Sequence, residues 1–228
     1  MKTSLLDADP DLARYLAPDS IRALGASLHA DVWELEPGPW APPLVEPERG
    51  HLGFLILSGM LVRRVMVDGS RSGELLKRGD VVRPWVEDPV SFCDADWQVV
   101  EPAQLAVLDR TVAARLCSRP ELNVALLDKQ MARTRSLAIS AATESVRGLD
   151  RRLLVLFWHL AERWGRREGQ EVVVPMHLTH ETLSLLIAAR RPSVTTALRS
   201  LSEDGALRRN EVGHWVLRGT PPMPNPQK

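Results

Sequence analysis

One segment near the C-terminus, Leu178 to Leu207, restricts the possible folds more than any other part of the chain. Its apolar residues fall into two sets with helical spacing and a short break between them: Leu183, Leu186 and Ile187, then Val194, Ala197, Leu198 and Leu201. Each predicted helix therefore has one buried face. Thr179 can cap the first helix, Pro192 suits the first turn of the second, and Gly205 marks its end. The segment predicts a helix-turn-helix.

The exposed face of the second helix carries cations and small hydroxyl groups, and no acidic residue of this helix precedes Glu203. A recognition helix in the major groove needs such groups, because arginines read guanine or hold phosphates, and threonines contact phosphate or the thymine methyl. The predicted DNA contacts in this segment are Thr179, Arg190, Arg191, Ser193, Thr195, Thr196 and Arg199. The alternative is an ordinary pair of helices with a solvated polar face.

Charge is distributed unevenly, although the chain of 228 residues has no formal net charge. Residues 1–118 contain 12 basic and 18 acidic residues, whereas residues 148–228 contain 12 basic and 8 acidic ones. The positive part contains the predicted helix-turn-helix, as expected for a surface that binds phosphate. The length suits one large domain or two modest ones.

From Ala30 onwards the pattern changes to short strands separated by Gly, Pro and Asp-Gly turns. We expect six strands, within residues 31–38, 51–59, 61–70, 74–82, 97–102 and 104–109. Short antiparallel strands of this kind form a barrel or jelly roll, which is a common ligand container. Residues 11–28 predict short helical pieces broken at Pro18, and the Pro-rich residues 37–47 predict a loop on the barrel.

Residues 119–147 contain no glycine, and no proline after Pro120, so they predict one long helix. At about 1.5 Å per residue such a helix spans about 40 Å, which exceeds what a small barrel covers, and it therefore needs a partner. Two neighbouring stripes are available: one is Leu127, Met131, Thr134, Ala138, Ala141 and Ser145, and the other is Leu122, Leu126, Arg133 and Leu137. The small residues of the first would let a second helix approach closely, and the second could pack on the barrel. We expect a homodimer through this helix, and the sequence does not decide which stripe forms it.

Gly148 and Asp150 interrupt the helical pattern and predict a hinge, followed by a strongly apolar core helix. A short strand at residues 172–175 leads into the helix-turn-helix, and residues 207–217 predict a hairpin that turns near Gly213. A helix-turn-helix followed by a hairpin is a winged helix.

The predicted wing adds cations near the expected DNA surface. Arg208 and Arg209 are predicted phosphate contacts, with His214 nearby, and solvated positions on an exposed strand are the alternative. Residues 220–228 predict a disordered tail. The predicted fold is α+β, with an antiparallel β-roll sensory domain at 1–118, a dimerisation helix at 119–147, a winged helix-turn-helix domain at 148–219 and the tail.

The order of these elements resembles the cyclic-AMP receptor protein / fumarate-nitrate regulator (CRP/FNR) superfamily of bacterial transcription regulators, over essentially the whole chain. The most specific matches are residues 178–207, which align with the family's helix-turn-helix without a gap, and LILSGMLVRRV with KRGDVV, which match its β-roll turns. The resemblance implies a homodimer that binds a pseudo-palindromic operator and acts with RNA polymerase.

The cyclic-nucleotide motif of that family is not retained. Members that bind cyclic nucleotides carry Gly-Glu-Leu after a Gly-Asp turn and, further on, an Arg-Ser that grips the cyclic phosphate. Here residues 79–80 are followed by two valines, and Cys93 and Asp94 stand where the family has Arg-Ser. Asp94 and Asp96 disfavour a phosphodiester at this place, and Arg83 is the alternative phosphate ligand.

Two further departures concern what the chain binds. The family's Arg-Glu-x-x-x-Arg in the recognition helix becomes residues 191–196 here, with Arg191 alone retained, so the operator should differ from the family consensus. A pocket for an unidentified small-molecule effector is predicted from the residues that follow the Gly-Asp turn: Arg83, Trp85, Phe92, Cys93 and Trp97. Packing in the barrel core is the alternative role for most of the aromatic residues.

Other classes of function make different demands on the sequence. A cupin-like metal enzyme needs clustered ligands, and the barrel offers His29 and His51 beside Glu46 and Glu48. Two cysteines are too few for a structural zinc or an iron–sulfur site, and lone histidines give no haem pattern, so no catalytic residue, metal or cofactor is predicted. An interaction module or RNA-binding protein with the same fold stays open. No secretory signal or long apolar run is present, which predicts a cytoplasmic protein without a membrane partner.

Overall fold

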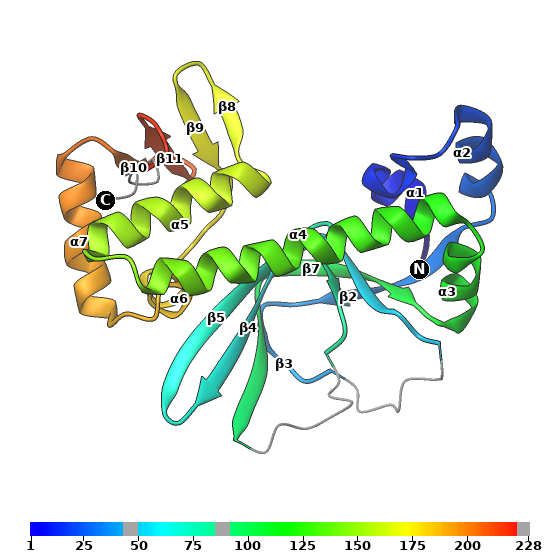
Figure 1. Cartoon of the computed structure of the whole chain (residues 1–228), viewed down its shortest axis with the longest axis horizontal. Helices are drawn as coiled ribbons and strands as arrows, with labels where there is room; N and C mark the ends of the chain where they lie inside the picture. Colours follow the sequence, from blue (N-terminus) through cyan, green and yellow to red (C-terminus); the bar gives the residue numbers. More distant parts are fainter. Residues whose placement is uncertain (43–49, 85–91, 223–228) are drawn as a thin grey trace, which may run out of the picture. The chain divides into compact units, whose positions relative to one another are not determined.

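The computed structural model describes residues 1–42, 50–84 and 92–222. These form two compact units: Met1–Gly69 with Glu74–Arg135, and Ser70–Gly73 with Ser136–Lys228. We call them the N-terminal and C-terminal units. The fold is α+β, as predicted, with an antiparallel sheet in the first unit and a helical domain with a small sheet in the second (Figure 1).

The antiparallel sheet is a β-roll with the strand order β1-β2-β7-β4-β5, to which β3 adds on β7 and β6 adds on β4. Its strands are β1 (Lys2–Ser4), β2 (His29–Leu35), β3 (Gly38–Trp40), β4 (Gly53–Val67), β5 (Ser70–Lys77), β6 (Val81–Val82) and β7 (Cys93–Leu108). Strand β3 lies within the segment that was expected to be a loop, so that expectation is wrong for Gly38–Trp40. Residues 43–47 of the same segment lie outside the described residues.

Strands β4 and β7 are much longer than the strands expected from the sequence. They pair along almost their whole lengths, with an irregular register on both sides of Gly59. Gly59 has φ +84°, and a Cβ atom added to it would lie 2.2 Å from the carbonyl oxygen of Pro102. Glycine therefore permits a close backbone approach inside a continuous strand. The expected breaks near residues 60 and 103 are absent from these two described strands.

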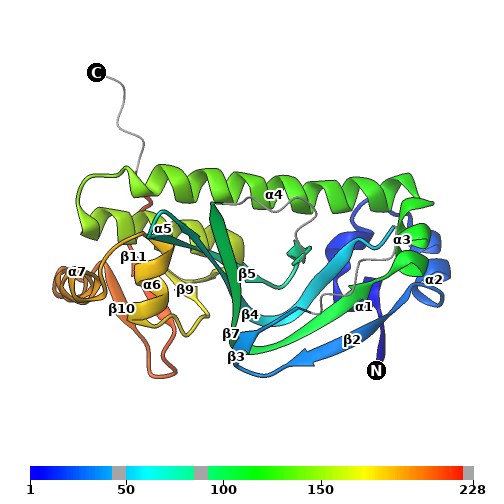
Figure 2. The same cartoon turned by 90° about the horizontal axis from the view of Figure 1, so that it is seen from below.

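Helices close one end of the β-roll, where Figures 1 and 2 both show them gathered around the start of α4. They are α1 (Leu5–Ala8), the 3₁₀ helix η1 (Pro10–Ala13), α2 (Pro18–Gly25), α3 (Arg110–Cys117) and α4 (Pro120–Glu144). Pro18 begins α2, which agrees with its place in a first helical turn. Leu5, Leu12, Leu116 and Leu122 are fully buried in one core shared by these helices and the sheet. The first turns of α4 are thereby fixed to the β-roll.

The C-terminal unit is a small winged domain. After α4 ends, Gly148 with φ +85° precedes α5. The elements are α5 (Leu149–Trp164), β8 (Arg166–Glu168), β9 (Glu171–Val174), α6 (His180–Leu186), α7 (Arg191–Glu203), β10 (Leu207–Arg209) and β11 (Trp215–Arg218). The four strands pair antiparallel in the order β10-β11-β9-β8, and the hairpin between β10 and β11 contains Gly213 with φ +82°, as expected. The rings of Phe157 and Trp215, whose centroids are 4.8 Å apart, join α5 to the sheet.

Among the described residues, no helix is long and apolar enough to cross a membrane.

Candidate nucleic-acid interface

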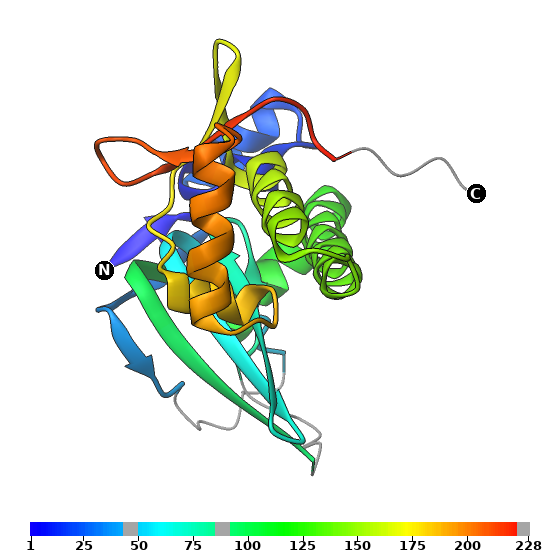
Figure 3. The same cartoon turned by 90° about the vertical axis from the view of Figure 1, so that its left-hand side faces the viewer.

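Helices α6 and α7 form the predicted helix-turn-helix, as Figure 3 shows from the side of α7. Thr179 is the N-cap of α6, and its Oγ1 accepts a hydrogen bond of 3.1 Å from the backbone N–H of Thr182. The turn contains Ala188 with φ +48°, a left-handed conformation that is uncommon outside glycine. Pro192 lies in the first turn of α7, as expected. The apolar faces of both helices are buried, which leaves the opposite face of α7 to solvent.

The exposed face of α7 carries all six residues predicted for it: Arg190, Arg191, Ser193, Thr195, Thr196 and Arg199. Their hydrogen bonds differ. The Thr195 and Thr196 hydroxyls donate to the carbonyl oxygens of Arg191 and Pro192, four residues earlier, at 3.2 and 3.3 Å. Arg199 Nε lies 2.8 Å from the Glu203 carboxylate in an exposed ion pair, which stabilises the helix little. No hydrogen bond or ion pair is found for the side chains of Arg191 and Ser193 among the described residues.

His180, the first residue of α6, was not predicted to take part in this surface. Its Nδ1 lies 2.9 Å from Thr195 Oγ1, which joins the start of α6 to the exposed face of α7. Partial burial, followed by the positive charges of Arg209 and Arg191, lowers the pKa of His180 below its ordinary value. A polar residue before the first apolar residue of α6 was the only available sequence signal, and it does not reveal a partner fifteen residues away.

The two predicted arginines of the wing already have partners. Arg208 Nη2 lies 2.8 Å from the Glu171 carboxylate on β9, and Arg218 pairs with the same carboxylate. Arg209 donates to the carbonyl oxygen of Leu178 at 2.8 Å. The guanidinium carbon of Arg209 also lies 4.4 Å from the centre of the Trp215 ring, a distance typical of a cation–π contact. Arg209 therefore ties the wing to the residue that precedes the cap of α6.

A second hydrogen bond connects the wing tip to the loop that precedes α6. His177 Nε2 forms a hydrogen bond of 2.9 Å with the carbonyl oxygen of Val212, and the rings of His177 and His214 lie 5.1 Å apart. Asn210 accepts from the His214 N–H at 2.8 Å within the turn. The hairpin is thus held in place beside the helix-turn-helix.

The residues predicted for an effector pocket in the β-roll do not share one environment. Trp97 is buried at 7% exposure against Trp40, whereas Phe92 is 73% exposed and Cys93 is partly exposed. Trp85 lies outside the described residues. Arg83 follows β6 and has interactions of its own. The pocket therefore stays a prediction.

A cluster of charged side chains connects α4 to the β-roll. Arg133 of α4 makes two hydrogen bonds, of 2.6 and 2.9 Å, to the carboxylate of Glu74, and a third of 3.1 Å to the carbonyl oxygen of Val81. Arg63 lies 3.8 Å from the same carboxylate. Glu74 is 10% exposed, so its charge depends on these partners.

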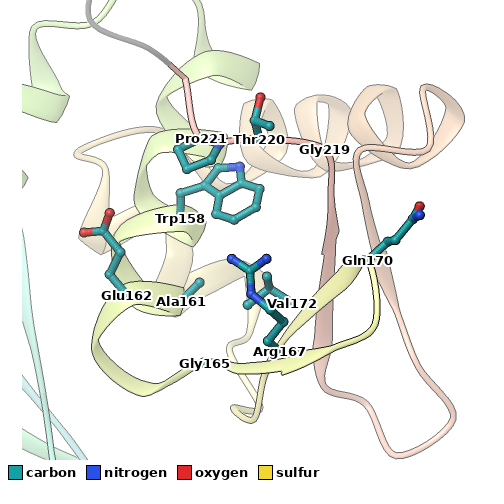
Figure 4. Close-up of a pocket in the computed structure, with 10 residues that line it drawn as sticks. All are labelled: Trp158, Ala161, Glu162, Gly165, Arg167, Gln170, Val172, Gly219, Thr220 and Pro221. Carbon is teal, nitrogen blue, oxygen red and sulfur yellow. The ribbon is translucent and has the colours of Figure 1, made fainter.

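A hollow of about 430 Å³ lies in the C-terminal unit, outside the predicted DNA surface (Figure 4). It is formed by the end of α5, the β8–β9 hairpin and the residues after β11, and Figure 4 shows Arg167 and Trp158 pointing toward one another within it. None of its lining residues belongs to the predicted effector pocket in the β-roll.

The described residues contain no group of three or more His, Cys, Asp or Glu side chains arranged to hold a metal ion. His51, one of the residues weighed for a cupin-like site, uses Nδ1 to accept from the Gly53 N–H at 2.8 Å. Of the other candidate ligands, His29 is exposed at the start of β2, and Glu46 and Glu48 lie outside the described residues.

Comparison with known proteins agrees with this geometry. A family model described as the Crp-like helix-turn-helix domain matches residues 151–218, which include α5, both helices of the motif and the wing. This part of the chain is a Crp-like helix-turn-helix domain. The predicted resemblance to the CRP/FNR superfamily is thereby confirmed for this domain, and solved structures agree with the predicted fold. No curated protein matches the sequence.

Solved structures are similar to this chain in fold over most of its length, including the β-roll. A cyclic nucleotide-binding domain containing protein from Listeria monocytogenes EGD-e is similar over 92% of this chain and 97% of its own, with 15% identity and a TM-score of 0.66. A CooA mutant from Carboxydothermus hydrogenoformans is similar over 95% and 92%, with 16% identity and a TM-score of 0.64. FixK2 from Bradyrhizobium japonicum is similar over 83% and 93%, with 14% identity and a TM-score of 0.61. At these identities the likeness concerns the fold alone.

Proposed function

We propose that this chain binds operator DNA as a homodimer, with α7 of each protomer in one half-site of a pseudo-palindrome. The proposal includes control of transcription together with RNA polymerase, and it includes no catalytic step. The observation that carries it is the exposed face of α7 within the Crp-like domain. This face presents three arginines and three hydroxyl groups, and its first carboxylate is Glu203 at the end of the helix.

The exposure of α4 supports one of the two predicted stripes as the dimer seam. Leu122 is fully buried and Leu126 packs partly on the N-terminal core, so that stripe serves the β-roll. Leu127 and Met131 are 60% and 54% exposed, and Val124, three residues before Leu127, is 46% exposed. Side chains of this size at alternating spacings of three and four are typical of a helix that packs against a second helix. We therefore place the two-fold axis along the stripe that contains Leu127.

The β-roll is proposed to sense something other than a cyclic nucleotide. Asp96 forms an ion pair with Arg64, and Asp94 is exposed two residues before it on β7, so the acidic groups at this place disfavour a cyclic phosphate. Arg133 is engaged with Glu74. An apolar or aromatic effector suits the tryptophan-rich roll better.

Selection of bound fragments from genomic DNA, using the purified full chain, tests the proposal directly. The expected result is an inverted repeat whose half-sites lie about one helical turn apart, because a two-fold dimer reads the same sequence twice. Enrichment of a single half-site, or of nothing, would contradict the proposed homodimer or the proposed DNA binding.

A variant of the recognition helix then tests which element reads the sequence. Arg191→Ala is expected to weaken binding to the selected repeat by about 1–3 kcal/mol and to relax one base position in each half-site. Arg22→Ala removes an equal charge from an arginine that is 82% exposed on α2, and it should leave the preference unchanged. An equal loss on all sequences would assign Arg191 to a phosphate instead.

A further inference from the structure

His180 and Thr195 make a contact that crosses the helix-turn-helix. His180 begins α6, and Thr195 lies on the exposed face of α7, one turn from its start. The Nδ1 to Oγ1 distance of 2.9 Å is that of a well-formed hydrogen bond. Neither residue belongs to the buried core of the domain, so the contact is a property of the surface that faces DNA in the proposed function.

The other hydrogen bond of Thr195 indicates the direction of this one. A threonine hydroxyl has one proton and two lone pairs, and the Thr195 proton is directed to the carbonyl oxygen of Arg191 at 3.2 Å. The hydroxyl can then accept from His180 only if Nδ1 carries a proton. A neutral ring with its proton on Nδ1 has a bare Nε2, whereas the charged ring has N–H groups at both positions.

Partial burial and two positive charges act on this ring. One charge is Arg209 of β10, whose guanidinium is held by the Leu178 carbonyl and the Trp215 ring, and the other is Arg191 of α7. Together they favour the neutral ring in the free protein and lower the pKa of His180. DNA phosphates near Arg191 and Arg209 would oppose these charges and favour the protonated ring.

We propose that His180 is a positioning residue for DNA recognition: its ring orients the Thr195 hydroxyl on α7, and operator binding protonates the ring. This inference rests on the proposed function, because it requires that α7 meets DNA. The proton comes from solvent and attaches to a ring nitrogen, so the complex holds one more proton per protomer than the free dimer. In the charged ring Nδ1–H donates to Thr195, and Nε2–H is left to donate toward the anionic backbone.

The sign of the expected pH dependence follows from this proton uptake. The pKa of His180 is lowered in the free protein and higher in the complex, so operator affinity rises as pH falls through the interval between these two values. Each unit of difference between the two pKa values amounts to about a tenfold change in affinity per protomer.

The test measures binding of the full chain to a duplex of the selected repeat, by fluorescence anisotropy between pH 5.5 and 8.5 at constant ionic strength. Affinity of the wild-type chain should increase at least about threefold from pH 8 to pH 6. His180→Gln keeps an amide donor but does not titrate, so it should remove this increase. His29→Gln, a change of the same kind at an exposed position of β2 in the N-terminal unit, should retain it. A pH profile of His180→Gln identical to that of the wild-type chain would overturn the proposal.

The threonine provides an independent arm. Thr195→Val keeps the shape and loses the hydroxyl, so it should weaken specific binding, whereas Thr195→Ser should restore it. The double variant His180→Gln/Thr195→Val should lose less affinity than the product of the two single fold-losses, because either change alone already removes the same contact. Independent, multiplicative effects would show that the two residues do not act together.

Two further measurements keep the outcome decisive. Circular dichroism of each variant identifies a loss of folding. If His180→Gln fails to fold, NMR titration of the wild-type His180 ring with and without the duplex replaces it, and an equal pKa in both states would overturn the proposal. Absence of any sequence-selective binding by the wild-type chain would instead reject the proposed function, so the two failures are distinguishable.

Discussion

Replacement of Leu127 by alanine tests the proposed dimer seam. Leu127 is 60% exposed in the single chain, and a symmetric interface would cover it in both protomers. Full burial of a leucine contributes about 1.5–3 kcal/mol. Because about three fifths of the side chain is free to be covered and alanine retains its Cβ, the loss is about 1 kcal/mol per copy. The two copies together lose about 2 kcal/mol, which is about a 30-fold weaker dimer.

Sedimentation equilibrium over a range of protein concentrations measures this change. Alanine is the better helix former, so α4 itself should not suffer, and the thermal unfolding of the variant should show this. Leu137→Ala is the matched control, because Leu137 belongs to the other stripe of α4 and is 44% exposed. It should change the dimer constant less than about threefold. A larger effect of Leu137→Ala than of Leu127→Ala, or a wild-type chain that stays monomeric, would refute the assignment of the seam.

Three other predictions concern stability and can be checked by urea unfolding. Arg133→Met should destabilise the chain by about 3–5 kcal/mol because it leaves the carboxylate of Glu74 buried without its main partner. The double variant with Glu74→Gln should recover part of that loss; no recovery would show that the pair is not the cause. Thr179→Ala should cost about 0.5–2 kcal/mol through loss of the α6 cap, and Thr179→Ser should cost less. The pKa of Glu171 is lowered, mainly by its hydrogen bond with Arg218, so its contribution is present above the pKa of the unfolded chain and is lost as pH falls through the folded pKa. Glu171→Gln should remove that part of the loss of stability at acid pH. An unchanged dependence of the unfolding free energy on acid pH would contradict this.

The helix-turn-helix was predictable because its signals are local. Helical spacing, the cap at Thr179 and Pro192 in a first turn all lie within one segment, and the structure has each of them. The strands were less predictable because their lengths depend on distant partners. Gly59 indicated a turn in the sequence, and only its approach to Pro102 on β7 explains why β4 continues past it. Strand β8 has no apolar residue, and its pairing with β9 is what orders it.

The proposed DNA-binding surface could also be predicted from the sequence only in part. The residues expected on the exposed face of α7 are exposed, since helical spacing determines which face is buried. His180 was missed, and the engagement of Arg209 with Leu178 and Trp215 was not foreseen, because both contacts join parts of the chain that only the tertiary fold brings together. A list of cations in the sequence therefore overstates how many are free to bind DNA.

If α7 reads bases as proposed, hydrogen bonds within the helix also limit which of its groups can do so. The Thr196 hydroxyl proton is directed to the Pro192 carbonyl, so Thr196 offers DNA a methyl group and lone pairs. Arg199 is paired with Glu203, whereas Arg191 at the start of the helix has no such partner among the described residues. Since base edges are met by the N-terminal residues of a recognition helix, Arg191 should discriminate between bases and Arg199 should not. We expect Arg199→Ala to weaken binding to the selected repeat and to an unrelated duplex by the same factor. This loss should be smaller than the loss of binding to the selected repeat in Arg191→Ala. Binding assays on both duplexes measure this, and a loss of base preference in Arg199→Ala would show that the Glu203 pair opens when DNA binds.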